Sequence, residues 1–102
     1  MNYAAIKKLQ KLQKEMEETQ KEIEETVVTA TSGGVVSVDV LGTKEIISIK
    51  ILDGFAAESS EDLEMLSDMI VAACNKAYAD IEKITKEKMA KYQSLLNMGG
   101  MF

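Results

Sequence analysis

The sequence predicts an α+β domain in which a long helix, a three-stranded antiparallel β-meander and a second long helix follow one another. Apolar residues recur every three or four positions over the first 25 residues and again from about residue 60, which is helical spacing. Between these segments apolar and polar residues alternate, which is typical of strands. A chain of 102 residues allows one domain, assigned here to residues 1–96, with residues 97–102 expected to form a flexible tail of Gly and Met.

The first helix is predicted over residues 2–25. Its apolar stripe has heptad-like spacing and consists of Ala5, Ile6, Leu9, Leu12, Met16 and Ile23. The rest of the segment is mostly Lys, Glu and Gln, which are strong helix formers. A single apolar stripe on a polar helix has to pack either within the subunit or against the same helix of a partner.

The three strands are separated by two turns. Gly33-Gly34 is predicted to be a two-residue hairpin link, because glycine adopts the positive φ angles that a tight turn requires. The second turn is predicted at residues 41–44. The alternating apolar positions are Val28 and Ala30, then Val36, Val38 and Val40, then Ile47, Ile49 and Ile51.

A loop is expected over residues 53–60, and Ser59-Ser60-Glu61-Asp62 supplies a hydroxyl cap and acidic residues for the start of the second helix. This helix is predicted to extend to about Leu96. Its apolar stripe consists of Leu63, Leu66, Ile70, Ala73, Ala77, Ile81 and Ile84.

Composition argues against an enzyme. The chain has no His, the side chain used most often for acid–base catalysis near neutral pH, and its one cysteine, Cys74, has no neighbouring base. No set of residues predicts a metal, cofactor or small-molecule substrate site. The chain shows no signal-peptide core and no apolar run long enough to span a membrane, so we expect a cytoplasmic protein.

Lysine is concentrated near the two chain ends, although the net charge is −5. Residues 1–14 carry a local charge of +4, residues 15–79 carry −10, and residues 80–102 carry +1. If the two helices are antiparallel, eight lysines gather at one tip and suit contact with a phosphate backbone. The alternative is an ordinary solvated helix face whose lysines pair with Glu15 and Glu18.

The order and spacing of these elements resemble the YbaB/EbfC family of bacterial nucleoid-associated proteins. The resemblance extends from about Ile6 to Met89. Its most specific parts are Gly33-Gly34-Val35-Val36 followed by Val38, Val40 and Gly42, the block Glu61–Ala77, and the triplet Glu87-Lys88-Met89.

The resemblance implies a tweezer-like homodimer that binds duplex DNA through helical arms, with no enzymatic activity. It further implies a nucleoid location and a role in chromosome organisation or regulation of gene expression. The expected DNA-binding residues lie on those arms: Lys7, Lys8, Lys11, Lys14, Lys83, Lys86, Lys88 and Lys91. Because the chain has no Arg, the residue best suited to bidentate base recognition, we expect phosphate contacts with low sequence specificity.

A protein–protein interaction module with little or no DNA binding is the alternative. The acidic midsection and the sequence pI of about 4.7 favour it, because net negative charge opposes the approach of DNA at long range.

Overall fold

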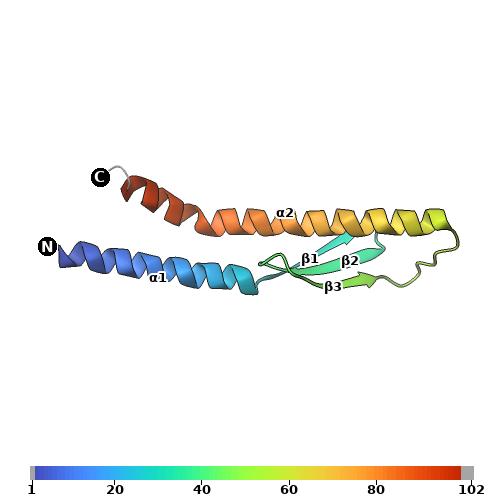
Figure 1. The fold of residues 1–102 in the computed structure, drawn as a ribbon, viewed down its shortest axis with the longest axis horizontal. Coiled ribbons are helices and arrows are strands. Elements are labelled where there is room, and N and C mark those ends of the chain that lie inside the picture. Colours follow the sequence, from blue (N-terminus) through green and yellow to red (C-terminus); the bar gives the residue numbers. More distant parts are fainter. Residues whose placement is uncertain (1, 100–102) are drawn as a thin grey trace.

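The order of helices and strands agrees with the predicted α-β-β-β-α arrangement. A computed structural model describes residues 2–99, with side chains through residue 95. Its elements are α1 (Tyr3–Glu25), β1 (Val27–Ser32), β2 (Val36–Leu41), β3 (Ile46–Ile51) and α2 (Ser60–Gly99) (Figure 1). Helix α2 ends three residues beyond the predicted end at residue 96. Residues 100–102 of the expected flexible tail lie outside the described part of the chain.

Side-chain caps define the beginning of both helices. The Asn2 side chain accepts a hydrogen bond from the Ala5 amide at 3.2 Å, so it satisfies one of the free N–H groups at the start of α1. At α2 the Ser59 hydroxyl accepts from the Asp62 amide at 3.2 Å, and the Asp62 carboxylate accepts from the Glu58 amide at 2.9 Å. The hydroxyl cap predicted from the sequence is therefore present.

The first hairpin loop is one residue longer than predicted. Ser32 pairs with Val36, so the loop contains three residues, Gly33, Gly34 and Val35, instead of two. Both glycines have positive φ angles, 60° and 67°, as predicted. Val35 belongs to the loop because its amide donates a hydrogen bond to the Ser32 carbonyl oxygen at 3.1 Å, which closes the turn.

The three strands form one antiparallel sheet in the order β1-β2-β3, with an irregularity in β3. Val40 pairs with Ile46 and Asp39 pairs with Ser48, so Ile47 has no partner on β2, as in a β-bulge. Ile49 and Ile51 lie opposite Val38 and Val36 and therefore share the face of the sheet that those valines occupy.

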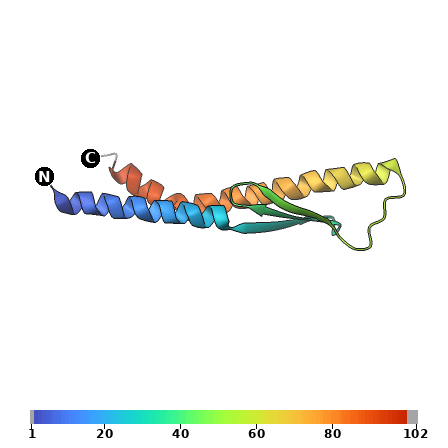
Figure 2. The same ribbon diagram turned by 60° about the horizontal axis from the view of Figure 1, so that its bottom comes forward.

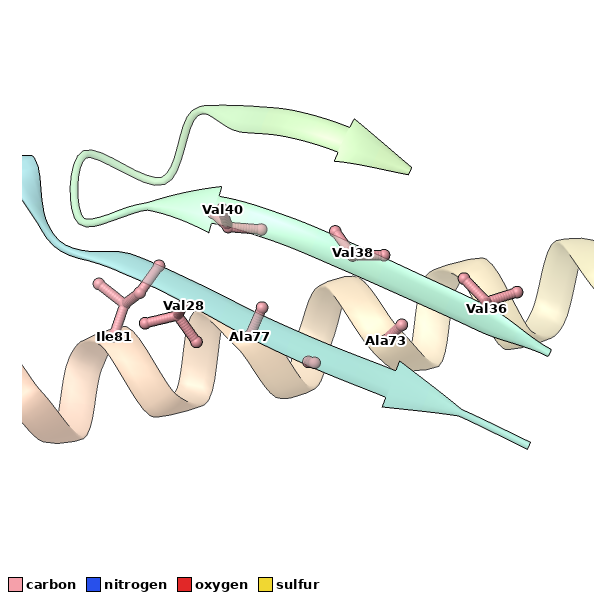
Figure 3. Packing of buried hydrophobic residues seen from close by; sticks show 8 residues of the cluster. Val28, Val36, Val38, Val40, Ala73, Ala77 and Ile81 are labelled. Atoms are coloured by element: carbon pink, nitrogen blue, oxygen red, sulfur yellow. The ribbon is translucent and has the colours of Figure 1, made fainter. Parts of the chain in front are cut away.

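The hydrophobic core lies between α2 and one face of the sheet. Eight buried side chains form it (Figure 3): Val28, Ala30, Val36, Val38, Val40, Ala73, Ala77 and Ile81. Because Ala73 and Ala77 are small and fully buried, the helix can approach the strands closely. Helix α2 contacts β1 and β2, and β3 forms the far edge of the sheet.

The molecule is elongated, with extents of 73 × 22 × 15 Å. Helix α1 runs antiparallel to the second half of α2, and both views show this pair extending away from the sheet, with the start of α1 and the end of α2 at the same extremity (Figures 1 and 2). We call this two-helix projection, formed by α1 and residues 82–99 of α2, the arm.

Candidate nucleic-acid interface

The two helices of the arm are held in register by polar contacts. The hydroxyl groups of Thr19 and Tyr92 are 3.0 Å apart and share a hydrogen bond, and Lys88 Nζ lies 3.8 Å from the Glu22 carboxylate. Tyr92 and Ile23 are each only 2% exposed, so they form the apolar centre of this contact. The register places the residue 83–91 segment of α2 beside the second half of α1.

The base of the arm is packed closely against the turn between β2 and β3. The Gly42 amide donates to the Thr26 carbonyl oxygen at 2.8 Å, and a Cβ atom at Gly42 would overlap the Ile23 carbonyl group. Lys44 in the same turn forms an ion pair with Glu82 of α2 at 3.0 Å. The arm is therefore fixed to the sheet at the end of α1 and at the start of the projecting part of α2.

The structure places the eight predicted lysines on the arm, with all eight side chains exposed, but in two groups along its length. Lys7, Lys8, Lys11 and Lys14 lie in the first half of α1, towards the tip. The α2 lysines lie closer to the sheet, because Lys88 is level with Glu22 and residue 92 is level with residue 19. The expected single cluster of eight lysines at one tip is therefore replaced by a distal group and a proximal group.

The two groups have different electrostatic surroundings. The second half of α1, residues 15–25, carries six Glu and one Lys, and it lies beside the proximal group. Charges within a Debye length of about 8–10 Å offset one another. Lys88 contacts Glu22, and Lys91 lies over the Tyr92 ring with its Nζ 4.8 Å from the ring centre.

The distal group has fewer acidic neighbours in its own helix, where only Lys11 and Lys14 have a glutamate, Glu15 and Glu18, one helical turn away. Residues 2–14 contain four lysines and no acidic residue. This segment also displays the predicted apolar stripe, of which Leu9 is 64% exposed and Ile6 is 40% exposed. A shallow hollow of about 310 Å³ lies along the stripe and is lined by Leu9, Leu12, Gln13 and Met16. The distal half of α1 is thus a basic surface with exposed apolar side chains.

The glycine pair and the single cysteine considered in the sequence analysis have structural roles. Gly33 and Gly34 form a turn, and Cys74 is half-buried against the helix–sheet core. In the part of the chain that the structure describes, no group of three or more Cys, Asp or Glu side chains is arranged to hold a metal ion. None of the described helices combines the length and hydrophobicity needed to cross a membrane.

A polar cluster around Asp39, on the uncovered face of the sheet, was not predicted from the sequence. The Asp39 carboxylate accepts hydrogen bonds from the Thr29 hydroxyl at 2.6 Å and from the Ser48 hydroxyl at 3.0 Å. These two hydrogen bonds, with a smaller effect from the Lys50 charge, hold the pKa of Asp39 below its ordinary value of 3.8. The sequence does contain one of these polar residues on each predicted strand. The strand register, which the sequence does not provide, is needed to show that the three residues lie next to one another.

Comparisons with known proteins find similarity to one family of DNA-binding proteins. The model of the YbaB/EbfC DNA-binding family matches residues 1–96. A nucleoid-associated protein of Clostridium kluyveri is 43% identical over 98 residues, covering 95% of this chain and 84% of its own length. A nucleoid-associated protein of Clostridium acetobutylicum is 46% identical over 97 residues, covering 94% and 85%. The crystal structure of an uncharacterized protein from Helicobacter pylori aligns with a TM-score of 0.59 at 29% identity, covering 78% of this chain and 90% of that one.

Proposed function

This chain belongs to the YbaB/EbfC DNA-binding family, and we propose that it binds duplex DNA as a homodimer, mainly through lysine–phosphate contacts with low sequence specificity. Its relatives are named nucleoid-associated proteins, which supports a nucleoid location in the bacterial cytoplasm. The corresponding role is chromosome organisation or regulation of gene expression. We assign the chain no enzymatic activity, cofactor or small-molecule substrate.

The observation that carries this proposal is the distal lysine group. Four exposed lysines on the first half of α1, with no acidic residue among them, form a basic surface on a protein whose net charge is −5. Lysine attracts phosphate as a point charge and releases condensed counterions from DNA when it binds. The distal group is therefore expected to make the principal contacts, and Lys83, Lys86, Lys88 and Lys91 to add weaker ones.

Low specificity follows from the side chains that the arm offers. The chain contains no Arg, and lysine contacts to phosphate oxygens fix the position of a protein on DNA without reporting the base sequence. A homodimer would present two arms to one duplex and so double the number of these contacts.

The test is binding of the purified protein to a mixed-sequence duplex over a series of salt concentrations, measured by fluorescence anisotropy, with light scattering on the same sample. The proposal predicts a mass about twice 11.2 kDa and an affinity that decreases steeply with salt. A folded protein that shows no binding even at low salt would contradict it.

A protein–protein interaction module is the second candidate function. It is favoured by the acidic residues 15–79, with a local charge of −10, and by exposed apolar side chains such as Leu9. Purification from a nuclease-treated lysate separates the two candidates. A defined protein partner that survives nuclease treatment supports the interaction module, whereas loss of all partners supports DNA binding.

A further inference from the structure

The first turns of α1 project beyond the end of α2. Thr19 and Tyr92 are level with each other, because their hydroxyl groups share a hydrogen bond, and the two helices are antiparallel. Gly99, the last residue of α2, is therefore level with about residue 12 of α1, since both helices rise 1.5 Å per residue. Figures 1 and 2 both show the start of α1 extending past the end of α2. We call residues 3–14 of α1 the tip segment.

The tip segment has an apolar face that lies largely open to solvent. Leu9 follows Ala5 by four residues and precedes Leu12 by three, so the three side chains lie on one face of the helix. Two turns beyond Leu12 the same face reaches Thr19, where it contacts α2. Leu9 and its neighbour Ile6 are 64% and 40% exposed. The contact face of α1 therefore continues past the helix that covers it.

Lysine side chains occupy the other face of the tip segment. Lys7, Lys11 and Lys14 are separated by four and three residues and so share one face. Leu9 is two residues from Lys7 and from Lys11, which places it about 200° around the helix from each of them. The tip segment is therefore amphipathic, with an exposed apolar face and an exposed lysine face.

Lysines also border the apolar face at both of its edges. Lys8 precedes Leu12 by four residues and Lys7 follows Tyr3 by four, so the members of each pair are neighbours on the helix surface. The Tyr3 side chain is 69% exposed. The tip segment contains no acidic residue. Lysine and aromatic side chains at the borders of an apolar face are typical of helices that bind at the surface of a membrane.

We propose that the tip segment binds the surface of a membrane that contains anionic phospholipids. The apolar face enters the boundary between the headgroups and the acyl chains, and the lysines at its edges reach the lipid phosphates. A helix that lies in this boundary does not need the length of a membrane-spanning helix. This inference goes beyond the proposed function and does not depend on DNA binding.

An anionic lipid surface fits both faces of the tip segment, whereas other occupants fit only one. DNA presents phosphates to the lysines but no apolar layer to Leu9 on the opposite side of the helix. A second copy presents an apolar face, but two tip segments packed face to face bring the lysines at their edges together, and like charges oppose this contact. Residues 15–79, with a local charge of −10, are repelled by anionic lipid, so the lysine-bearing tip is the part of the molecule that can approach it.

The first experiment measures co-sedimentation of the nuclease-treated protein with vesicles of phosphatidylglycerol and, separately, of phosphatidylcholine. Leu9→Gln tests the apolar face, and Leu63→Gln is the matched control because Leu63 is 55% exposed on α2 outside the arm. We expect the parent and Leu63→Gln to bind phosphatidylglycerol alone, and Leu9→Gln to bind about tenfold more weakly. Lys7→Gln/Lys11→Gln should weaken binding by roughly fivefold for each lysine replaced.

The second experiment identifies the face that enters the lipid. The chain contains no Trp, so a single introduced Trp reports its own surroundings. Leu9→Trp places the reporter on the apolar face, and Ala4→Trp places it on the lysine face, two turns before Lys11. On addition of phosphatidylglycerol vesicles, we expect the emission of Leu9→Trp to shift to shorter wavelength and to be quenched less by acrylamide. The emission of Ala4→Trp should change little.

Three results would overturn the inference. The first is a folded parent protein that does not bind phosphatidylglycerol vesicles. The second is equal vesicle binding by Leu9→Gln and Leu63→Gln, and the third is an equal response of the two Trp variants, since either would indicate adsorption by charge alone. A mass above that of a dimer that Leu9→Gln reduces, without vesicle binding, would assign the apolar face to a second copy.

DNA binding by the same proteins separates this inference from the proposed function. Leu9→Gln should keep the DNA affinity of the parent, because it retains every lysine. A parent protein that binds vesicles through Leu9 but binds no DNA supports this inference and refutes the DNA-binding proposal. A parent protein that binds DNA but no vesicles supports the DNA-binding proposal and refutes this inference.

Discussion

Thr19 and Tyr92, separated by 73 positions in the sequence, share a hydrogen bond between their hydroxyl groups at 3.0 Å. The Tyr92 ring is only 2% exposed, so the bond is made at the apolar contact between α1 and α2. Together with the contact between Lys88 and Glu22, this pair shows which residues of the two helices are level with each other, and therefore where the two lysine groups lie.

Replacing Tyr92 by Phe removes the hydrogen bond and keeps the buried ring. We expect the free energy of unfolding to decrease by about 0.5–1.5 kcal/mol, the usual net contribution of such a bond. Thr19→Val should cost a similar amount, and the double variant should cost less than the sum of the two because both remove one interaction. Urea denaturation of the four proteins measures this, and strict additivity would show that the two hydroxyl groups are not coupled.

Gly42→Ala should weaken the attachment of the arm to the sheet. The added Cβ would overlap the Ile23 carbonyl group, which belongs to the backbone and cannot rotate away. We expect a loss of more than about 3 kcal/mol in stability, because either the turn or the end of α1 has to move. Gly34→Ala is the control: its Cβ meets no atom within 4 Å, so the cost is limited to about 1–2 kcal/mol for its φ of 67°. Equal thermal shifts for the two variants would contradict this account.

The Asp39 carboxylate should make stability dependent on pH under acidic conditions. Because its pKa is lower in the folded protein than the ordinary value of 3.8, its contribution is fully present above that value and is lost as the pH falls through the folded pKa. Asp39→Asn should therefore lower the urea midpoint at pH 7 and should show a smaller further decrease between pH 5 and pH 3 than the parent. Parallel pH profiles for the two proteins would mean that the carboxylate has no such effect.

Lys7→Gln/Lys11→Gln should reduce the salt dependence of DNA binding. Removing one lysine–phosphate interaction makes the negative slope of log K against log salt shallower by about 0.9, and the affinity should decrease alike for all sequences. The matched control is Lys50→Gln/Lys76→Gln, which changes the net charge equally but alters exposed lysines outside the arm. An equal decrease in slope for both double variants would indicate a general charge effect and not a binding surface.

The α2 lysines allow a separate prediction. Replacing Lys83, Lys86, Lys88 and Lys91 by Gln should reduce the salt slope less than replacing the four α1 lysines, because glutamates of α1 already lie beside the α2 group. Anisotropy titrations of the two quadruple variants provide the comparison. A larger effect from the α2 group would assign the principal contacts to the base of the arm.

Periodicity, together with the Gly33-Gly34 turn and the Ser59 cap, was sufficient to predict the elements of this fold. The alternation of Val36, Val38 and Val40 with polar residues matches a strand whose three valines are all buried, and Ser59 caps α2 as expected. The three-residue hairpin loop and the bulge at Ile47 could not be predicted, because both depend on which residues pair across strands. That information is a property of the sheet and not of any one segment.

The lysines of the arm could be predicted as a set, but not their grouping. Knowing that two helices are antiparallel does not determine their axial register. The offset between Lys14 and Lys91 along the arm depends on the contacts of Thr19 with Tyr92 and of Glu22 with Lys88. The exposure of Ile49 could not be predicted either, since its position in the strand pattern is equivalent to that of the buried Val38. Which strand lies beneath α2 is decided by tertiary packing.

Helix α2 covers the sheet with Ala73 and Ala77 and continues as one helix to Gly99 in the arm. Mechanically the arm is therefore a cantilever whose fixed end is embedded in the hydrophobic core. A force applied near the tip is transmitted along the helix backbone and becomes a torque on the helix–sheet contact. The resistance of the arm to bending therefore depends on the packing of α2 in the core, and a substitution that weakens this packing should also make the arm easier to displace.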